Sequence, residues 1–278
     1  MLAVVLLTMV VSTASAQSLQ VMTWNIRYDN PGDGENRWRN RRDWVAEIIL
    51  REKADIAGFQ EVLAGQLADL KQRLPDLAAY GVGRDDGKLA GEMAPIFYRR
   101  SRFEMLEQGS FWLSTTPDKA GSKGWDAALP RVAGWLKLKD NQTQATFYVV
   151  NAHFDHRGAE ARRRSAELIV ERVRGQFAAH PVIFMGDLNS VPDSPACEVL
   201  TAKVGGQALL RDASEHAAKK AGPDATWNGF EKIVPGSRID YLFVTESFKL
   251  HELRTLTDQR DGRFPSDHLP IVVELEIR

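Results

Sequence analysis

One stretch of the chain, VIFMGDLN at residues 182–189, joins an apolar run to two polar residues. The β-branched and aromatic residues of this run predict a buried strand that ends near Gly186. Asp187 and Asn189 flank Leu188, so we expect both polar side chains to point the same way from the strand end. Such a pair suits the binding and deprotonation of a water molecule. A turn is an equally good interpretation, because Gly, Asp, Asn and Ser are frequent turn formers.

Five other segments also place a polar side chain beside an apolar, β-type run. They are, in chain order, Trp24-Asn25, Gln60-Glu61, Asn151-Ala152-His153, Ile239-Asp240-Tyr241 and Ser266-Asp267-His268. Strand ends open into loops, and side chains at such ends can converge on one pocket. The six segments together therefore predict a functional site, although no single segment does.

The last of these segments pairs His268 with an aspartate, and Asp240 offers a further carboxylate from another strand. A histidine with an aspartate partner has a fixed tautomer and keeps its positive charge more readily, which suits it to a phosphate or a leaving oxygen. A hydrogen-bonded loop that caps a strand is the better interpretation of an Asp-His pair taken alone. Only the presence of the other segments favours a functional histidine over a capping loop.

Hard oxygen ligands are present in the same set of segments. Glu61, Asn25 and Asp267 suit Mg²⁺ or Mn²⁺. His153 and His156 are three residues apart, but zinc would need more His or Cys nearby. Glu61 could instead complement a helix dipole, and Asn25 could be a turn residue.

The composition excludes several classes of protein. The chain has 278 residues, of which 44% are hydrophobic and 26% charged, so it can bury a full core. Its formal net charge of −1 gives no global footprint for duplex DNA or an anionic membrane. A single cysteine, Cys197, allows no intramolecular disulfide.

The first residues predict a signal peptide. Residues 1–16 form an apolar run that ends in Ala14-Ser15-Ala16, the small-x-small pattern of a signal-peptidase site. No Lys or Arg precedes the run, and a buried N-terminal helix or strand is the alternative. We expect an exported protein, periplasmic or secreted, with one functional domain over residues 18–278.

Beyond this leader, β-type runs alternate with amphipathic helical patterns. The predicted strands are Leu19–Asn25, Ile56–Gln60, Ala94–Arg99, Ala133–Leu138, Ala145–Asn151, Val182–Gly186, Arg238–Val244 and Leu269–Ile277. The predicted helices are Arg42–Glu52, Gly65–Leu74 and Ala159–Phe177. The middle strands have no helices between them, so we expect an α/β fold with two packed, mixed or antiparallel sheets. The long loops at Gly81–Gly91, Thr115–Ala128 and Gly222–Gly236 would frame a site.

The six segments, taken in this order, resemble the endonuclease/exonuclease/phosphatase superfamily, whose fold is that of deoxyribonuclease I. The resemblance runs from about Val21 to Ile277. It implies a four-layer α/β sandwich, in which two mixed or antiparallel sheets pack face to face with helices on both outer sides. It also implies an Mg²⁺-dependent or Mn²⁺-dependent phosphoester hydrolase.

The same resemblance implies a role for each site residue. Glu61 would hold the metal with help from Asn25 and Asp267. Asp187 would orient and deprotonate the attacking water, while Asn189 would steady that water and the phosphate. His268, held by Asp240, would stabilise the negative charge that grows on the phosphoryl oxygens. His153 would bind the same phosphoryl group.

Local details resemble the bacterial, exported group related to the deadenylase-like (carbon-catabolite-repressor) exonucleases. The matching segments are Arg37-Trp38-x-x-Arg41-Arg42, Pro95-Ile96-Phe97-Tyr98 and Asn151–His156 followed by Ala161-Arg162. Four arginines are candidate phosphate ligands, since a guanidinium binds phosphate in a bidentate manner: Arg37, Arg41, Arg131 and Arg162. Solvated helix surface is the alternative for such arginines.

We expect a phosphodiesterase or nuclease, for which a 3′–5′ exonuclease on RNA or single-stranded nucleic acid is one form. The alternatives are a phosphatase and a phospholipid or sphingomyelin phosphodiesterase, so the substrate could be nucleic acid, an inositol phosphate or a phospholipid head group. A catalytically dead binding module is disfavoured, because Glu61, Asp187, Asn189, Asp240 and His268 are all present. We expect a monomer without a protein partner.

Overall fold

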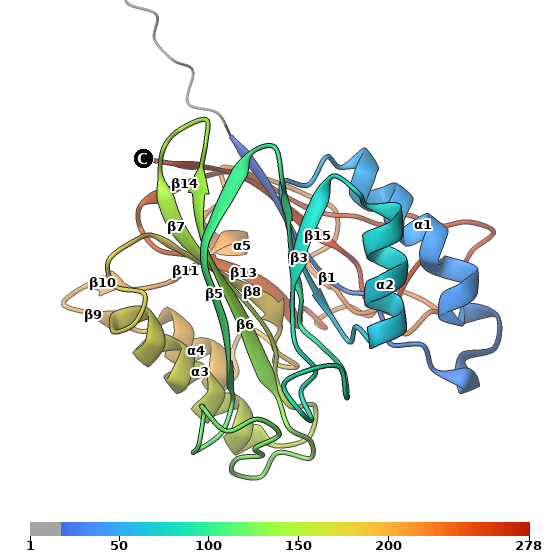
Figure 1. Cartoon of the computed structure of the whole chain (residues 1–278), viewed down its shortest axis with the longest axis horizontal. Helices are drawn as coiled ribbons and strands as arrows, with labels where there is room; N and C mark the ends of the chain where they lie inside the picture. The colour runs from blue at the N-terminus through green and yellow to red at the C-terminus, as the bar shows by residue number, and fades with distance from the viewer. Residues whose placement is uncertain (1–17) are drawn as a thin grey trace, which may run out of the picture.

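Two β-sheets form the centre of the computed structural model, which describes residues 18–278 (Figure 1). The first sheet has the spatial order β12 (Lys219–Ala221), β14 (Phe248–Thr255), β15 (Ile271–Ile277), β1 (Leu19–Asn25), β2 (Ile56–Gln60), β4 (Ile96–Arg99) and β3 (Leu77–Tyr80). The second has the order β11 (Arg211–Asp212), β13 (Asp240–Val244), β8 (Val182–Asp187), β7 (Thr146–His153), β6 (Val132–Asp140) and β5 (Phe103–Trp112). In each sheet a parallel pair, β1 with β2 or β7 with β8, has antiparallel neighbours, so both sheets are mixed.

An apolar core fills the space between the sheets. Strand residues alternate between the two faces of a sheet, and every second residue of the central strands is apolar. The first sheet contributes Val21 and Ile56, and the second contributes Val149 and Ile183 to the same buried cluster. These strands form because only a two-sheet arrangement buries all of these side chains at once.

Helices cover the outer face of each sheet. α1 (Trp38–Arg51) and α2 (Ala64–Arg73) pack on the first sheet, while α3 (Ala159–Arg174) and α4 (Pro195–Thr201) pack on the second (Figure 1). The result is the predicted four-layer α/β sandwich. None of the helices within residues 18–278 is long and apolar enough to cross a lipid bilayer.

The predicted elements match the structure best in the buried strands. β1 and β2 have the predicted bounds, and no helix or strand occurs in the predicted loops 81–91, 115–128 and 222–236. The strands β3, β5 and β14 were not predicted, because their residues are partly polar and partly exposed. The remaining short elements are η1 (Pro31–Asn36), β9 (Lys203–Val204), β10 (Gln207–Ala208) and α5 (Ala213–His216). The predicted signal peptide, residues 1–16, lies outside the described residues.

A glycine at the end of β8 allows its close contact with β7. Gly186 has φ of 152°, a conformation that side chains with a Cβ rarely adopt. A Cβ at this position would collide with the carbonyl oxygen of Ala152. The chain therefore needs glycine immediately before Asp187.

Replacing this glycine should destabilise the protein. We expect Gly186→Ala to lower the free energy of unfolding by about 2 kcal/mol or more, because it combines backbone strain with a steric collision. Urea denaturation followed by circular dichroism would measure the change. Gly65→Ala is the matched control, since a Cβ at Gly65 meets no atom within 4 Å. Equal stability of the two variants would contradict the collision.

Candidate active site

Three adjacent strands of the second sheet bring acidic and imidazole side chains into one row. Asp187 at the end of β8 is in register with His153 on β7 and with Asp240 on β13. Residues directly opposite each other on paired strands project from the same face of the sheet. The row faces the first sheet, because Asp187 accepts a hydrogen bond from Asn25 of β1.

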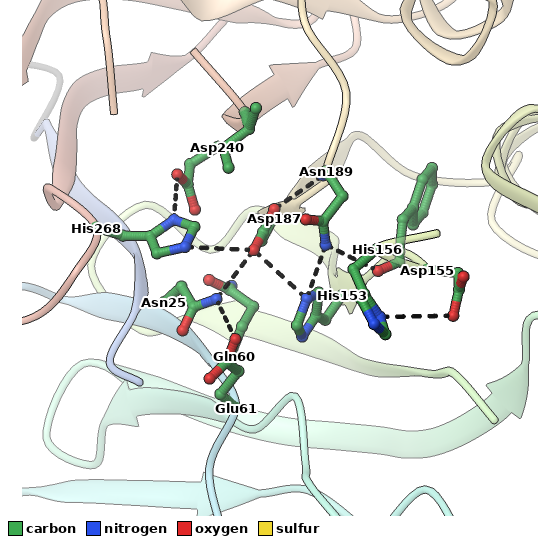
Figure 2. A network of polar contacts seen from close by, with 12 residues as sticks. Asn25, Gln60, Glu61, His153, Asp155, His156, Asp187, Asn189, Asp240 and His268 are labelled. Atoms are coloured by element: carbon green, nitrogen blue, oxygen red, sulfur yellow. Dashed lines mark hydrogen bonds and ion pairs between the residues drawn. The ribbon is translucent and has the colours of Figure 1, made fainter. Parts of the chain in front are cut away.

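Asn25 connects this row to the first sheet. Its Nδ2 donates to Asp187 Oδ2 over 2.9 Å and to Glu61 Oε1 over 3.1 Å (Figure 2). Asn25 is in register with Gln60 of β2, which places the next residue, Glu61, at the same end of the sheet. The strand ends that the sequence predicted to converge therefore lie together. They belong to β7, β8 and β13 of the second sheet and to β1 and β2 of the first.

His268 lies between two carboxylates. Its Nδ1 is 2.8 Å from Asp240 Oδ2, and its Nε2 is 3.8 Å from Asp187 Oδ2 (Figure 2). The hydroxyl of Ser266 donates to the backbone oxygen of Asn25 and holds the loop that carries His268 against β1. All of these side chains are buried.

The environment sets opposite charge states on the two imidazoles. Burial opposes a charge on His268, but the carboxylates of Asp240 and Asp187 raise its pKa well above the ordinary value. Burial and the positive charge of Arg131 lower the pKa of His153 well below its ordinary value. At neutral pH the site therefore holds an imidazolium at His268 and a neutral imidazole at His153.

Asp187 itself has a strongly perturbed pKa. Burial and the negative charge of Asp240 raise the pKa of Asp187 to about 7. A carboxylate with such a pKa is a much better proton acceptor near neutral pH than an ordinary aspartate. This agrees with its predicted role as the residue that deprotonates water.

Asn189 orients its neighbours. Its backbone N–H donates to Asp187 Oδ1, and φ of 47° shows that the chain turns here, so the turn and the site interpretations both hold. Asn189 Nδ2 donates to the Phe154 carbonyl oxygen, which fixes the orientation of the amide. The same nitrogen lies 2.9 Å from His153 Nε2, so Nε2 accepts a hydrogen bond and Nδ1 carries the ring proton.

Glu61 and Asp267 form the part of the site that fits a hard divalent cation. Both carboxylates lie near Arg27 Nη1, at 4.0 Å from Glu61 Oε2 and 3.8 Å from Asp267 Oδ2. Burial and the negative charge of Glu61 raise the pKa of Asp267, so a cation beside the two carboxylates would favour their charged forms. Carboxylate oxygens are the ligands that Mg²⁺ and Mn²⁺ prefer.

Asn25 contacts two carboxylates of the site. The side chain turns its amide nitrogen toward Glu61 and Asp187, while its Oδ1 accepts from the backbone N–H of Arg27. Asn25 is thus a hydrogen-bond donor to two carboxylates, and its contact with a metal ion stays a prediction.

Asp187, Asp240 and His268 form a second group whose candidate metal-ligating atoms all lie within 4.8 Å of one another. The protonated His268 already balances charge in this group. A cation is therefore better placed at Glu61 and Asp267 than between these three residues.

Arg41 is bonded to the backbone of several segments. This arginine is 3% exposed, and its Nη1 donates to the carbonyl oxygens of Ile26 and Pro265. Its Nε donates to the carbonyl oxygen of Asn36. Arg41 therefore holds loops of the site together, and phosphate binding by Arg41 stays a prediction.

The other three candidate arginines differ in how their guanidinium groups are held. Arg131 is held by Asp155 and by His156, but its buried Nη1 has no hydrogen-bond partner. Arg162 Nη1 donates to the backbone oxygen of Asp155. The third, Arg37, has its Nε 3.7 Å from Asp29 Oδ1. Phosphate binding by these three stays a prediction.

Three residues of the site were not predicted. Arg27 lies between Glu61 and Asp267, and Arg84 pairs with Glu92 beside His153. The signal for Arg27 was its position two residues after Asn25. Glu92 directly precedes the apolar run that leads into β4, the same pattern that marked the other segments.

Comparisons with known proteins agree with this geometry. A model of the Endonuclease/Exonuclease/phosphatase family matches residues 22–268. An endonuclease/exonuclease/phosphatase from Bacteroides vulgatus is 40% identical with a TM-score of 0.90, and the alignment covers 94% of this chain and 100% of that one. The mannosyl-6-phosphatase Bt3783 of Bacteroides thetaiotaomicron is 38% identical with a TM-score of 0.87, over 92% of this chain and 99% of that one.

More distant similarities occur in solved structures and in curated sequences. The human Nocturnin catalytic domain, solved with a bound sulfate anion, is 19% identical with a TM-score of 0.71, over 94% of both chains. The chain spans 31% and 60% of the length of two curated relatives, which are uncharacterized proteins of Acanthamoeba polyphaga mimivirus. With residues 22–268 matched by the family model and the six segments brought to one site, this chain belongs to the endonuclease/exonuclease/phosphatase family.

Proposed function

We propose that this protein hydrolyses phosphoesters with the help of a divalent cation, and that Asp187 activates the attacking water. The observation that carries the proposal is the close approach of a base and an imidazolium. His268 Nε2 lies 3.8 Å from Asp187 Oδ2, while Asp240 holds the opposite nitrogen of the ring. A proton acceptor for water and a positive charge for the phosphoryl oxygens thus stand side by side.

The chemistry follows from the charge states of these residues. Asp187 takes a proton from water as the water oxygen bonds to phosphorus and the bond from phosphorus to the leaving oxygen breaks. The leaving oxygen takes a proton from solvent and departs as the alcohol. His268, as the imidazolium, stabilises negative charge that grows on the phosphoryl oxygens. Glu61 and Asp267 would hold Mg²⁺ or Mn²⁺, which supplies further neutralisation of the phosphoryl charge when it is bound.

Among phosphoesters, we propose a monoester of a hydroxyl-rich alcohol such as a sugar. Support comes from the 38% identical relative described as a mannosyl-6-phosphatase, which the chain matches over nearly its whole length. The formal net charge of −1 also disfavours a long polyanion as substrate. Residues 111–113 are buried and form no exposed apolar hairpin for a lipid surface. The phosphodiesterase expected from the sequence is the competing function.

A pair of chromogenic esters separates the two functions. With Mg²⁺ we expect hydrolysis of p-nitrophenyl phosphate and little hydrolysis of bis-p-nitrophenyl phosphate, measured by released nitrophenol. EDTA should abolish the activity, and Mg²⁺ or Mn²⁺ should restore it. Preference for the bis-ester would establish the phosphodiesterase instead, and rescue by Zn²⁺ alone would contradict the assignment of the metal.

Asp187→Asn should remove the base with little change in shape. We expect kcat to fall by about 10²-fold or more, because general-base catalysis contributes roughly that factor. The exposed Asp118 provides the matched control Asp118→Asn, and circular dichroism would show that both variants are folded. Wild-type kcat in Asp187→Asn would refute its role.

The pH dependence of kcat/KM should be bell-shaped and should depend on Asp240. Activity should rise with pH through about 7 as Asp187 ionises, and it should fall at alkaline pH as His268 loses its proton. The negative charge of Asp240 raises both pKa values, so Asp240→Asn should move both limbs to lower pH. An unchanged profile in Asp240→Asn, like the one expected for Asp118→Asn, would show that these groups do not control the rate.

A further inference from the structure

A small cavity lies at the Nδ1 edge of the His153 ring. Its volume is about 10 Å³, and its polar walls are Arg84, Glu92, Arg131 and His153. This is room for about one water-sized group. The cavity can therefore hold a single hydroxyl, but it cannot hold a sugar ring, a nucleobase or a whole phosphate.

Three residues that line this cavity each carry a buried nitrogen without a hydrogen-bond partner. These nitrogens are His153 Nδ1, Arg131 Nη1 and Arg84 Nε, on residues that are 7%, 4% and 9% exposed. Asn189 forces the ring proton of His153 onto Nδ1, so this nitrogen is a donor. Leaving such groups unpaired costs about 1–3 kcal/mol each, and an acceptor in the cavity would relieve that cost.

Glu92 supplies a hydrogen-bond acceptor in the same cavity. Its Oε2 accepts from Arg84 Nη1 over 2.7 Å and lies 3.9 Å from His153 Nδ1. An anionic phosphoryl oxygen would be repelled by this carboxylate, whereas a hydroxyl would donate to it. A hydroxyl also accepts from Arg131 or His153, so it is the group that matches every wall of the cavity.

The cavity is close to the reacting centre. The other ring nitrogen of His153, Nε2, lies 3.4 Å from Asp187 Oδ2. A group at Nδ1 is thus separated from the proposed base by one imidazole ring. A substrate group at Nδ1 would therefore belong to the alcohol portion of the substrate and not to its phosphoryl group.

We propose that this cavity binds one hydroxyl group of the substrate's alcohol portion, and that Glu92, Arg131 and His153 thereby select hydroxyl-bearing phosphoesters. The proposal rests on the phosphomonoesterase function above and specifies its substrate. Arg84 holds the Glu92 carboxylate in place, because its Nη1 donates to Glu92 Oε2.

Deoxy analogues test the proposal on the unaltered protein. We expect one monodeoxy analogue of a hexose 6-phosphate to show kcat/KM about tenfold or more below the parent sugar phosphate, since a site built to hydrogen-bond a hydroxyl rejects its absence. The other analogues should differ less. Equal rates for the parent and all analogues would show that the cavity holds only a water molecule and would overturn the proposal.

Glu92→Gln connects the missing hydroxyl to this cavity. The variant should lose about tenfold in kcat/KM on the parent sugar phosphate and little on the sensitive deoxy analogue, because the two changes remove the same contact. On p-nitrophenyl phosphate, which has no alcohol hydroxyl, the loss should be smaller than on the parent sugar phosphate. Losses of equal size on every substrate would contradict the proposal and indicate a general effect on the site.

Glu52→Gln is the matched control for this variant. Glu52 Oε2 also pairs with an arginine Nη1, that of Arg254, over 2.7 Å, and it lies outside the site. The Glu52→Gln variant should discriminate between the sugar phosphate and its analogues as wild type does. If no monoester at all is hydrolysed, the proposed function fails and the hydroxyl site fails with it. Hydrolysis of monoesters without discrimination overturns the hydroxyl site alone.

Discussion

The hydrogen bonds between the two sheets determine the geometry of the whole site. Asn25 Nδ2 reaches across to Asp187, and Gln60 Nε2 donates to Asn151 Oδ1 over 2.7 Å. Asn151 in turn donates from Nδ2 to carbonyl oxygens of Phe59 and Pro95, so it is held on both sides. Buried polar groups of this kind fix a spacing that apolar packing alone leaves adjustable.

Close approach of the sheets is part of the same constraint. A Cβ at Gly58 would lie 2.7 Å from Met185 Cε and 2.8 Å from Asn151 Cγ, so β2 can approach β8 and β7 only through glycine. The residues that follow these strands, Glu61 and Asp187, thereby come within reach of one amide, that of Asn25. Catalytic geometry is set here by strands and not by mobile loops.

Two histidines in one site have opposite protonation states because they have different neighbours. His268 lies against the carboxylates of Asp240 and Asp187, whereas His153 has Arg131 and Arg84 nearby. The charged ring can stabilise an anion, and the neutral ring can transmit a fixed hydrogen-bond direction from Asn189 to its Nδ1. The same residue type therefore performs two tasks, and sequence position alone does not distinguish them.

The sequence was sufficient where a residue's role depends on its own strand. The bounds of β1 and β2 follow from their apolar runs, and the polar residues after β2 and at the end of β8 reach the site as predicted. Contacts with distant backbone left no sign in the sequence: Arg41 is bonded to the carbonyl oxygen of Pro265, 224 residues away. The half-polar, partly buried strand β14 was missed for a similar reason, since it is ordered by its pairing with β15.

Part of the reacting centre lies within strands, whereas most of the proposed hydroxyl site lies in connecting segments. Asp187 and Asp240 lie within paired strands, where register fixes their relative positions. Arg84 and Glu92 lie in the connection between β3 and β4, and Arg131 lies just before β6. Connecting segments tolerate change that a register-locked strand end does not. A family with this fold can therefore keep one way of activating water while residues such as Glu92 change which alcohol is released.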